Sequence, residues 1–322
     1  MIYTIKNSKF IILGFLIGVI IWNYLISIHR DYPSAGAIFS QSMIDIKKES
    51  VKAFLDHEKI IFSGGSNIAY GIDCKILFES LGRPVINFGC MVGLGPEIIF
   101  ENIKPFTRQN DIIIFCWEYE TYLFNRTNRN LNYLGMIEGP QSRIKKNFSL
   151  YDRTLLRLYF PVNLTRFSVY SLINKNFNPN KIYACGWQFD SLGNVTSNSG
   201  NQIPERELLA TPLRPLLNKL TIHNDLYKIM RNINSFAKKN NLKLYATWPN
   251  TFEHPEYYSN HIVLKNFKTI KTFWRNLKIP LVGEPYDSMY TSEFFYDSCY
   301  HLNTKGVQLR TNKLSESFSE HL

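Results

Sequence analysis

Three short apolar runs, with helical patterns between them, most constrain how this chain can fold. The runs are "KIIFSG" at 59–64, "PVINFG" at 84–89 and "DIIIFCWEY" at 111–119. Each has the length and aliphatic content of a buried strand, whereas the segments 68–81 and 95–106 between them have helical patterns. Strands that alternate with helices predict an α/β fold with a parallel sheet and right-handed crossovers.

The alternation stops after the third run and resumes near residue 212. Residues 120–210 are rich in Asn, Arg and aromatic residues, which indicates an insertion in the α/β domain. The later elements are predicted from the same patterns: an amphipathic helix over 216–240, a strand at 242–249, a helix within 261–277, a short strand at 280–285 and a C-terminal helix.

The chain has 322 residues, of which 45% are hydrophobic, so it can bury a full core. Its formal net charge is +11, but Lys and Arg are scattered and no nucleic-acid signature accompanies them. We interpret the charge as attraction to an anionic envelope surface or polymer, with no nucleic acid as partner. The five cysteines form no C-x-x-C pair, and we expect no metal site and no cofactor.

An uncharged apolar segment at 10–28 lies near the N-terminus. Its 19 residues are long enough, at ~1.5 Å per residue, to cross a ~30 Å hydrocarbon layer. A cleavable signal peptide is the alternative, because "AGA" at 35–37 resembles a cleavage site. We favour an uncleaved anchor, because this apolar core is longer than that of a usual signal peptide.

Lys6 and Lys9 precede the apolar segment. Positively charged residues beside a membrane span favour the cytoplasmic side, so these two weakly indicate that the N-terminus is cytoplasmic. The prediction is a cytoplasmic N-terminus at 1–9, a transmembrane anchor at 10–28, a polar juxtamembrane stalk at 29–57 and an α/β domain at 58–322. The protein would then lie in the cytoplasmic membrane as a single-pass protein, with its large domain periplasmic or extracellular.

The first apolar run ends in "GGSN", which places Ser66 between a predicted strand and a predicted helix. Serine is a preferred N-cap residue, so Ser66 is either a helix cap or a nucleophile. Asp297 and His301 stand in "FYDSCYHLNTKG" just before the last helix. A hydroxyl, an acid and a base are therefore available in the chain order Ser, Asp, His.

These motifs resemble those of the SGNH/GDSL hydrolases. "GGSN" at 64–67 resembles their first block, "NFG" with Gly89 resembles their second, and "HLNTKG" resembles their C-terminal histidine block. The resemblance implies a flavodoxin-like three-layer α/β/α sandwich with a parallel sheet. It also implies ester chemistry, in which Ser66 attacks, His301 accepts and returns the proton, and Asp297 orients the imidazole. The backbone N–H groups of Ser66 and Gly89 would hold the oxyanion.

Two features depart from the family pattern. Asp297 precedes His301 by four residues, where the family usually has three, so the sequence leaves open whether the two side chains meet. Glu118 stands where the family has an oxyanion-hole Asn, and an ionised carboxylate would oppose an oxyanion. Asn67 and Asn250 are the candidate replacement donors, and Glu118 is a candidate site-lining residue.

Aromatic residues are candidates for stacking on sugar rings. In the polar insertion these are Trp187 and Phe189, whereas Trp117, Tyr119 and Tyr122 at the end of a buried strand are equally compatible with the core. His223, His254 and His261 lack carboxylates at metal-ligand spacing, which favours surface or capping roles.

Two classes of function follow from these observations. The first is an anchored serine esterase or O-acyltransferase that acts on acyl groups, in the first place acetyl groups, of an envelope or exported polysaccharide. A multi-pass membrane acyltransferase is the candidate partner. The second is a non-catalytic binding or assembly factor in polysaccharide modification or export, which the replacement by Glu118 favours. Which polymer and which acyl group are involved does not follow from the sequence.

Overall fold

The computed structural model of this protein describes residues 2–31, 35–125, 150, 154 and 188–322. The chain divides into two compact units, one made of residues 1–41 and 130–185 and the other of 42–129 and 186–322. The second unit contains the sheet and all the candidate site residues, of which Trp187 lies outside the described residues. The fold below is that of this unit.

A five-stranded parallel sheet forms the centre of the second unit, in the order β2-β1-β3-β4-β6. Every apolar run expected to be a strand contributes to it. The strands are β1 (Ile60–Gly64), β2 (Val85–Gly89), β3 (Ile112–Cys116), β4 (Lys243–Thr247) and β6 (Leu281–Val282). The prediction of an α/β fold with a parallel sheet is confirmed.

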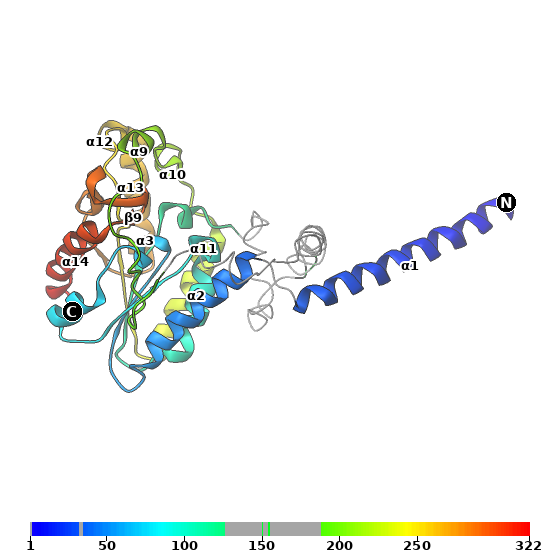
Figure 1. Ribbon diagram of the computed structural model, residues 1–322, viewed down its shortest axis with the longest axis horizontal. Helices are drawn as coiled ribbons and strands as arrows, with labels where there is room; N and C mark the ends of the chain where they lie inside the picture. The colour runs from blue at the N-terminus through cyan, green and yellow to red at the C-terminus, as the bar shows by residue number, and fades with distance from the viewer. Residues whose placement is uncertain (1, 32–34, 126–149, 151–153, 155–187) are drawn as a thin grey trace. The chain divides into compact units, whose positions relative to one another are not determined.

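Helices cover both faces of this sheet, which gives three layers (Figure 1). On one face, Ile60 and Phe62 of β1 pack with residues of α4 (Cys74–Leu81) and α14 (Thr304–Ser319). On the other face, Phe115 of β3 stacks on Trp274 of α13 (His261–Asn276), with 5.9 Å between ring centroids. Successive side chains of a strand point to opposite faces, so β1 and β3, which are buried along their whole length, require cover on both sides.

The remaining elements connect the strands or lie at the ends of the sheet. The helices are α3 (Ser66–Ala69), α5 (Gly95–Ile103), α9 (Glu205–Ala210), α10 (Arg214–Leu217), α11 (Asn224–Lys239) and α12 (Glu256–Ser259). The 3-10 turns are η1 (Val92–Leu94), η2 (Lys104–Phe106), η3 (Tyr119–Leu123), η6 (Pro285–Ser288) and η7 (Ser292–Phe294). Short strands form two further pairs: β5 (Thr251–Phe252) with β7 (Met289–Tyr290), and β8 (Phe295–Ser298) with β9 (His301–Leu302).

Two helices differ from the sequence-based expectation. The segment 68–81 is not one helix, because α3 ends at Ala69 and α4 begins only at Cys74, where the side chain of Asp73 accepts hydrogen bonds from the first turn. The segment 216–240 is not one helix either, because α10 ends at Leu217 and α11 begins only at Asn224, where the ring of His223 accepts a hydrogen bond from the Asp225 N–H. The capping role expected for His223 is therefore present.

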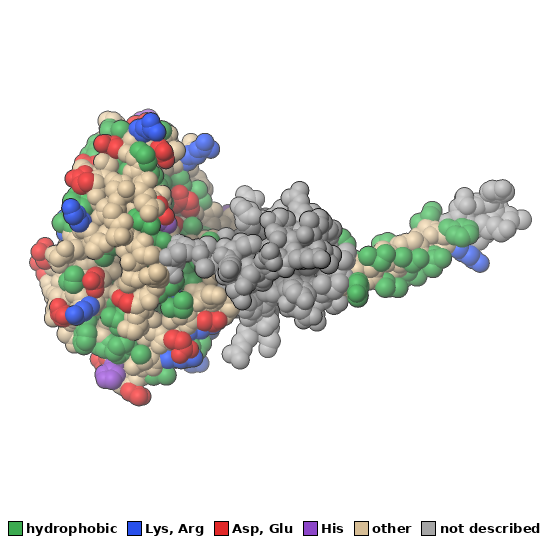
Figure 2. Space-filling model, in the orientation of Figure 1, with side chains coloured by type: hydrophobic (Ala, Val, Ile, Leu, Met, Phe, Trp, Pro, Cys, Tyr) green, Lys and Arg blue, Asp and Glu red, His purple; other side chains and the backbone are tan. Residues whose placement is uncertain are grey.

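The N-terminal segment forms a long helix, α1 (Ile2–Asp31), whose described side chains include well-exposed apolar residues such as Phe10 and Ile11. Figure 2 shows hydrophobic side chains along this helix. Among the residues that the structure describes, no helix is both long and apolar enough to cross a membrane. The transmembrane anchor at 10–28 stays a prediction.

The segment expected to be a stalk, 29–57, contains the helix α2 (Ala35–Lys52). Within the second unit, Met43, Ile44 and Val51 of this helix are buried. The end of α2 is therefore part of the core of the α/β unit and not a polar spacer.

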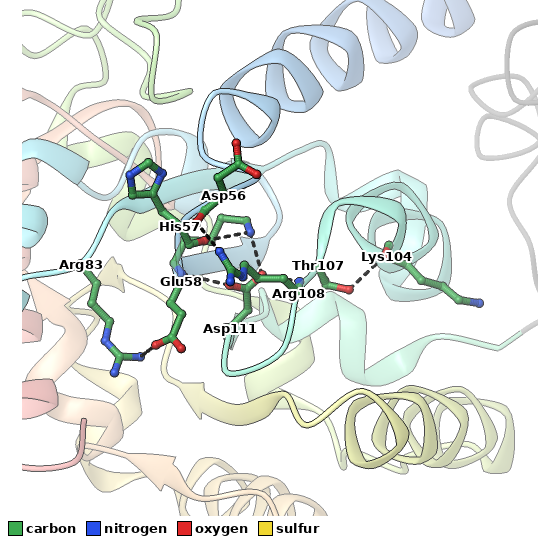
Figure 3. A network of polar contacts seen from close by, with 9 residues as sticks. Asp56, His57, Glu58, Arg83, Lys104, Thr107, Arg108 and Asp111 are labelled. Atoms are coloured by element: carbon green, nitrogen blue, oxygen red, sulfur yellow. Dashed lines mark hydrogen bonds and ion pairs between the residues drawn. The ribbon is translucent and has the colours of Figure 1, made fainter.

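A network of polar contacts joins the amino ends of β1 and β3 (Figure 3). Lys59 and Asp111 form a fully buried ion pair, with 2.8 Å between Nζ and Oδ2. The Asp111 carboxylate also accepts hydrogen bonds from the backbone N–H groups of Lys59 and Arg108. Both oxygens are thus engaged, as a buried charge requires, and the two strands start in a fixed register.

Candidate active site

The register of the central strands brings three loops to the same edge of the sheet. Gly64, the last residue of β1, lies opposite both Gly89 and Cys116, the last residues of β2 and β3. The strands therefore end level with one another at their carboxyl ends. Ser66 and Glu118 each follow two residues beyond a paired strand end, which places them side by side. Open parallel sheets bind their ligands at this edge.

Ser66 is the first residue of the short helix α3 and is half-buried. The N-cap position is occupied by Gly65, and no side chain caps this helix. The Ser66 hydroxyl instead donates a hydrogen bond to Oε1 of Glu118, with 2.9 Å between the oxygens. Of the two alternatives for Ser66, the helix cap is wrong, and the hydroxyl is held by a carboxylate.

Glu118 lies just beyond β3 and is almost completely buried. Its Oε1 also accepts the backbone N–H of Asn67 at 2.8 Å. Burial, followed by the charge of Glu120, raises the pKa of Glu118 to about 7, while the hydrogen bonds from Asn67 and Ser66 and the charge of His301 act in the opposite direction. Near neutral pH the carboxyl group is therefore poised between its two protonation states.

His301 and Asp297 come together on the β8–β9 hairpin. Oδ1 of Asp297 lies 2.6 Å from Nδ1 of His301, and the carboxylate can only accept, so the ring nitrogen donates. Ser298 pairs with His301 across a turn at 299–300, and this turn allows a four-residue spacing to bring the two side chains together. The hairpin lies against α3 through β9, so His301 and Ser66 belong to the same region.

Tyr300, in the turn of this hairpin, ties it to the loop after β3. Its hydroxyl donates to Oε2 of Glu120 at 2.8 Å and accepts the backbone N–H of Tyr119 at 3.2 Å. The ring is buried, so both contacts are shielded from water. The hairpin that carries His301 is thereby held against the loop that carries Glu118.

Three of the four residues predicted to supply oxyanion donors, Gly89, Asn67 and Asn250, donate to other groups in this structure. The N–H of Gly89 donates to Oδ1 of Asn87 at 2.9 Å. Asn67 donates its backbone N–H to Glu118 and its side-chain amide to Sγ of Cys116. The side-chain amide of Asn250 donates to the Tyr300 carbonyl at 2.5 Å. Asn67 and Asn250 are also fully buried and Gly89 is buried, so none of these three groups is presented to a substrate oxygen here.

A buried arginine behind the site was not expected from the sequence. Arg310 of α14 is 1% exposed, and its guanidinium donates to the carbonyls of Asn67 and Trp248 and to Sγ of Cys116. These contacts tie α3 to the ends of β3 and β4. A signal was present, because Arg310 lies four residues from both Gly306 and Leu314 on the buried stripe of its helix.

The aromatic residues predicted as candidates for sugar stacking lie in different environments. Trp117, Tyr119 and Tyr122 are each at most 2% exposed, so they belong to the core and not to a sugar-binding surface. Phe189 lies beneath the ammonium group of Lys47, 4.8 Å from the ring centroid. Trp187 lies outside the described residues.

The chain was compared with models of protein families, with curated proteins and with solved structures, and none of the three comparisons finds a match. The functional argument therefore rests on the geometry of Ser66, Glu118, His301 and Asp297.

Proposed function

We propose that this protein is a membrane-anchored serine esterase or O-acyltransferase of the SGNH type. Its substrate class would be the acyl groups, in the first place acetyl groups, of an envelope or exported polysaccharide. Ser66 supplies the nucleophile, and His301, held by Asp297, exchanges protons with the reacting oxygens. The fold would be the flavodoxin-like sandwich of that family.

The hydrogen bond between Asp297 and His301 is the observation that supports this proposal most. At 2.6 Å, it fixes the tautomer of an imidazole that is mostly buried, on a hairpin that contacts the helix bearing Ser66. The Asp297–His301 pair and the Ser66 hydroxyl, from distant parts of the chain, are thus carried by elements that contact each other. The net charge of +11 suits an anionic polymer as substrate.

A serine-directed fluorophosphonate probe tests the nucleophile. The wild-type protein should react with the probe and release acetate from an acetylated polysaccharide, whereas Ser66→Ala should do neither. His301→Ala should lower acetate release by at least about 100-fold, the usual scale of acid–base catalysis. Asp297→Asn should have a smaller effect, because Asp297 is 40% exposed and water can partly replace it.

The anchor is tested separately from the chemistry. We expect a protein without residues 1–28 to leave the membrane fraction and to keep its esterase activity. A reporter that is active only outside the cytoplasm should be active when fused to the C-terminus. Activity of a cytoplasm-only reporter at that position would contradict the proposed topology.

A non-catalytic binding or assembly factor is the second candidate. The occupied N–H groups of Gly89 and Asn67 favour it, because neither is open to an oxyanion in this structure. Equal probe reaction in the wild type and in Ser66→Ala, with polysaccharide binding retained, would support this candidate.

A further inference from the structure

Glu118 is in direct contact with the hydroxyl hydrogen of Ser66. Among the hydrogen bonds of the described residues, the one from Ser66 Oγ goes to Glu118 Oε1, at 2.9 Å. A general base must lie about 2.6–3.2 Å from the oxygen whose proton it removes. Glu118 meets this condition without any movement of either residue.

The carboxylate of Glu118 is also held in place. The Asn67 N–H donates to the same oxygen, Oε1, at 2.8 Å. Gly65 makes room for it, because a Cβ on Gly65 would lie 2.6 Å from Oε1 and 3.0 Å from Oε2. The strand-to-helix turn of the candidate nucleophile is therefore shaped to receive a carboxylate.

Several charged and titratable side chains, from different elements, lie around the Glu118 carboxyl group and affect its charge. Glu120 of η3 opposes its negative charge, whereas His301 of β9 favours it. The thiols of Cys116 and Cys299 and the phenol of Tyr300 also face it, but burial raises the pKa of each, so all three stay neutral near pH 7. The balance places the pKa of Glu118 at about 7, suitable for a base at neutral pH.

We infer that Glu118 is the base that takes the proton of Ser66, and that His301 serves the other partner of the acyl transfer. The inference rests on the proposed function, since it needs Ser66 as nucleophile. In acylation, Ser66 Oγ bonds to the acyl carbon and its proton moves to Glu118 Oε1. The bond to the departing alcohol breaks, and protonated His301 gives a proton to that alcohol's oxygen.

Deacylation reverses these proton movements. Neutral His301 takes a proton from the incoming water or sugar hydroxyl, whose oxygen bonds to the acyl carbon. The bond to Ser66 Oγ breaks, and Glu118 returns its proton to that oxygen. After one cycle every proton is back in place, with Glu118 ionised and His301 protonated.

Esters with different leaving groups separate this arrangement from one in which His301 alone serves Ser66. p-Nitrophenolate departs without a proton, whereas the alkoxide of an acetylated sugar needs one. Glu118→Gln, which keeps an oxygen that can accept from Ser66 and Asn67, should lower kcat/KM at least about 100-fold on both esters. His301→Ala should lose about 100-fold on the sugar ester but less than about tenfold on p-nitrophenyl acetate.

A pH profile gives a measurement that does not depend on the folding of the Glu118 variant. With p-nitrophenyl acetate, the acylation rate of the wild type should rise with pH and level off near pH 7. The inflection should persist in His301→Ala and move to higher pH, because a positive charge is lost. It should move to lower pH in Glu120→Gln, because a negative charge is lost.

Several results would overturn the inference. These are near-wild-type rates in Glu118→Gln, equal losses on both esters in His301→Ala, or a flat pH profile in that variant. If Glu118→Gln remains active while Ser66→Ala is inactive, the inference alone fails. If Ser66→Ala hydrolyses both esters like the wild type, the proposed function fails as well.

Discussion

The imidazole of His301 lies flat against the ring of Tyr70, with 4.1 Å between the ring centroids and 8° between the ring planes. Tyr70 is 2% exposed, and Tyr296 stacks with it at a centroid distance of 6.0 Å. Asp297 fixes the edge of the imidazole through Nδ1, and Tyr70 fixes its face. The two contacts together leave little freedom for Nε2, the nitrogen that would move protons.

Replacement of Tyr70 tests this contact. Tyr70→Leu should lower ester hydrolysis by about fivefold, because loss of a stacking contact worth ~1 kcal/mol leaves the imidazole free to leave its productive orientation. Tyr70→Phe keeps an aromatic ring and should stay within about threefold of the wild type. Rates are compared per folded protein, measured by circular dichroism. Equal losses in the two variants would contradict a role for the stacked ring.

Gly64 and Gly65 offer a matched pair of alanine substitutions. A Cβ on Gly64 would lie 2.2 Å from the backbone carbonyl oxygen of Cys116, so Gly64→Ala must move strands apart and should cost roughly 1–3 kcal/mol of stability. The three atoms nearest to a Cβ on Gly65 would all belong to the end of the Glu118 side chain. Since φ of Gly65 is −84°, alanine is allowed there.

Gly65→Ala should therefore retain most of its stability in urea unfolding but lose most of its esterase activity, because the Glu118 carboxylate is pushed away from Ser66. Gly64→Ala should show the larger loss of stability. An active and stable Gly65→Ala protein would argue against a need for the contact between Glu118 and Ser66.

The titration of Glu118 predicts a pH-dependent stability. Its pKa is raised from 4.5 to about 7 in the folded protein, so the native state holds the proton more tightly than the unfolded chain does. This contribution is complete below pH 4.5 and is lost as the pH rises through 7. Glu118→Gln should gain stability over the wild type across this interval, by up to about 3 kcal/mol. Urea unfolding of both proteins at pH 4.5 and pH 8 measures this difference in stability. A difference that is the same at both pH values would contradict the prediction.

The buried Lys47 should have the opposite effect on stability, which it should raise as the pH becomes alkaline. Its ammonium group is buried and donates to the carbonyl of Gly193 and to Oδ1 of Asn87, and burial lowers its pKa from 10.5 to about 8. Below pH 8 both the folded and the unfolded states hold the proton. Between pH 8 and 10.5 the Lys47 amine holds its proton more often in the unfolded chain than in the folded protein. This group therefore adds stability as the pH rises, up to about 3 kcal/mol.

Lys47→Met removes the titrating group and is the reference. The stability of the wild type relative to Lys47→Met should increase between pH 8 and pH 10, measured by urea unfolding at each pH. A relative stability that stays constant would mean that the Lys47 amine is not neutralised in the folded protein.

Local patterns in the sequence were sufficient to predict the layout of this protein. The apolar runs at 59–64, 84–89 and 111–119 contain strands, and the segments between them contain helices. Burial on both faces of a sheet and burial on one face of a helix leave different periods in the chain. The same patterns placed Ser66 at a strand-to-helix junction and Asp297 and His301 before the last helix.

The tertiary structure decided which side chains meet. Ser66 and Glu118 are 52 residues apart, and only the parallel register that pairs Gly64 with Cys116 brings the hydroxyl to the carboxylate. The contact between Asp297 and His301 depends on a hairpin turn, and the burial of Lys47 and Arg310 depends on how α2 and α14 pack. Such contacts arise from the packing of whole elements, whereas periodicity reports only on the nearest turns of the chain.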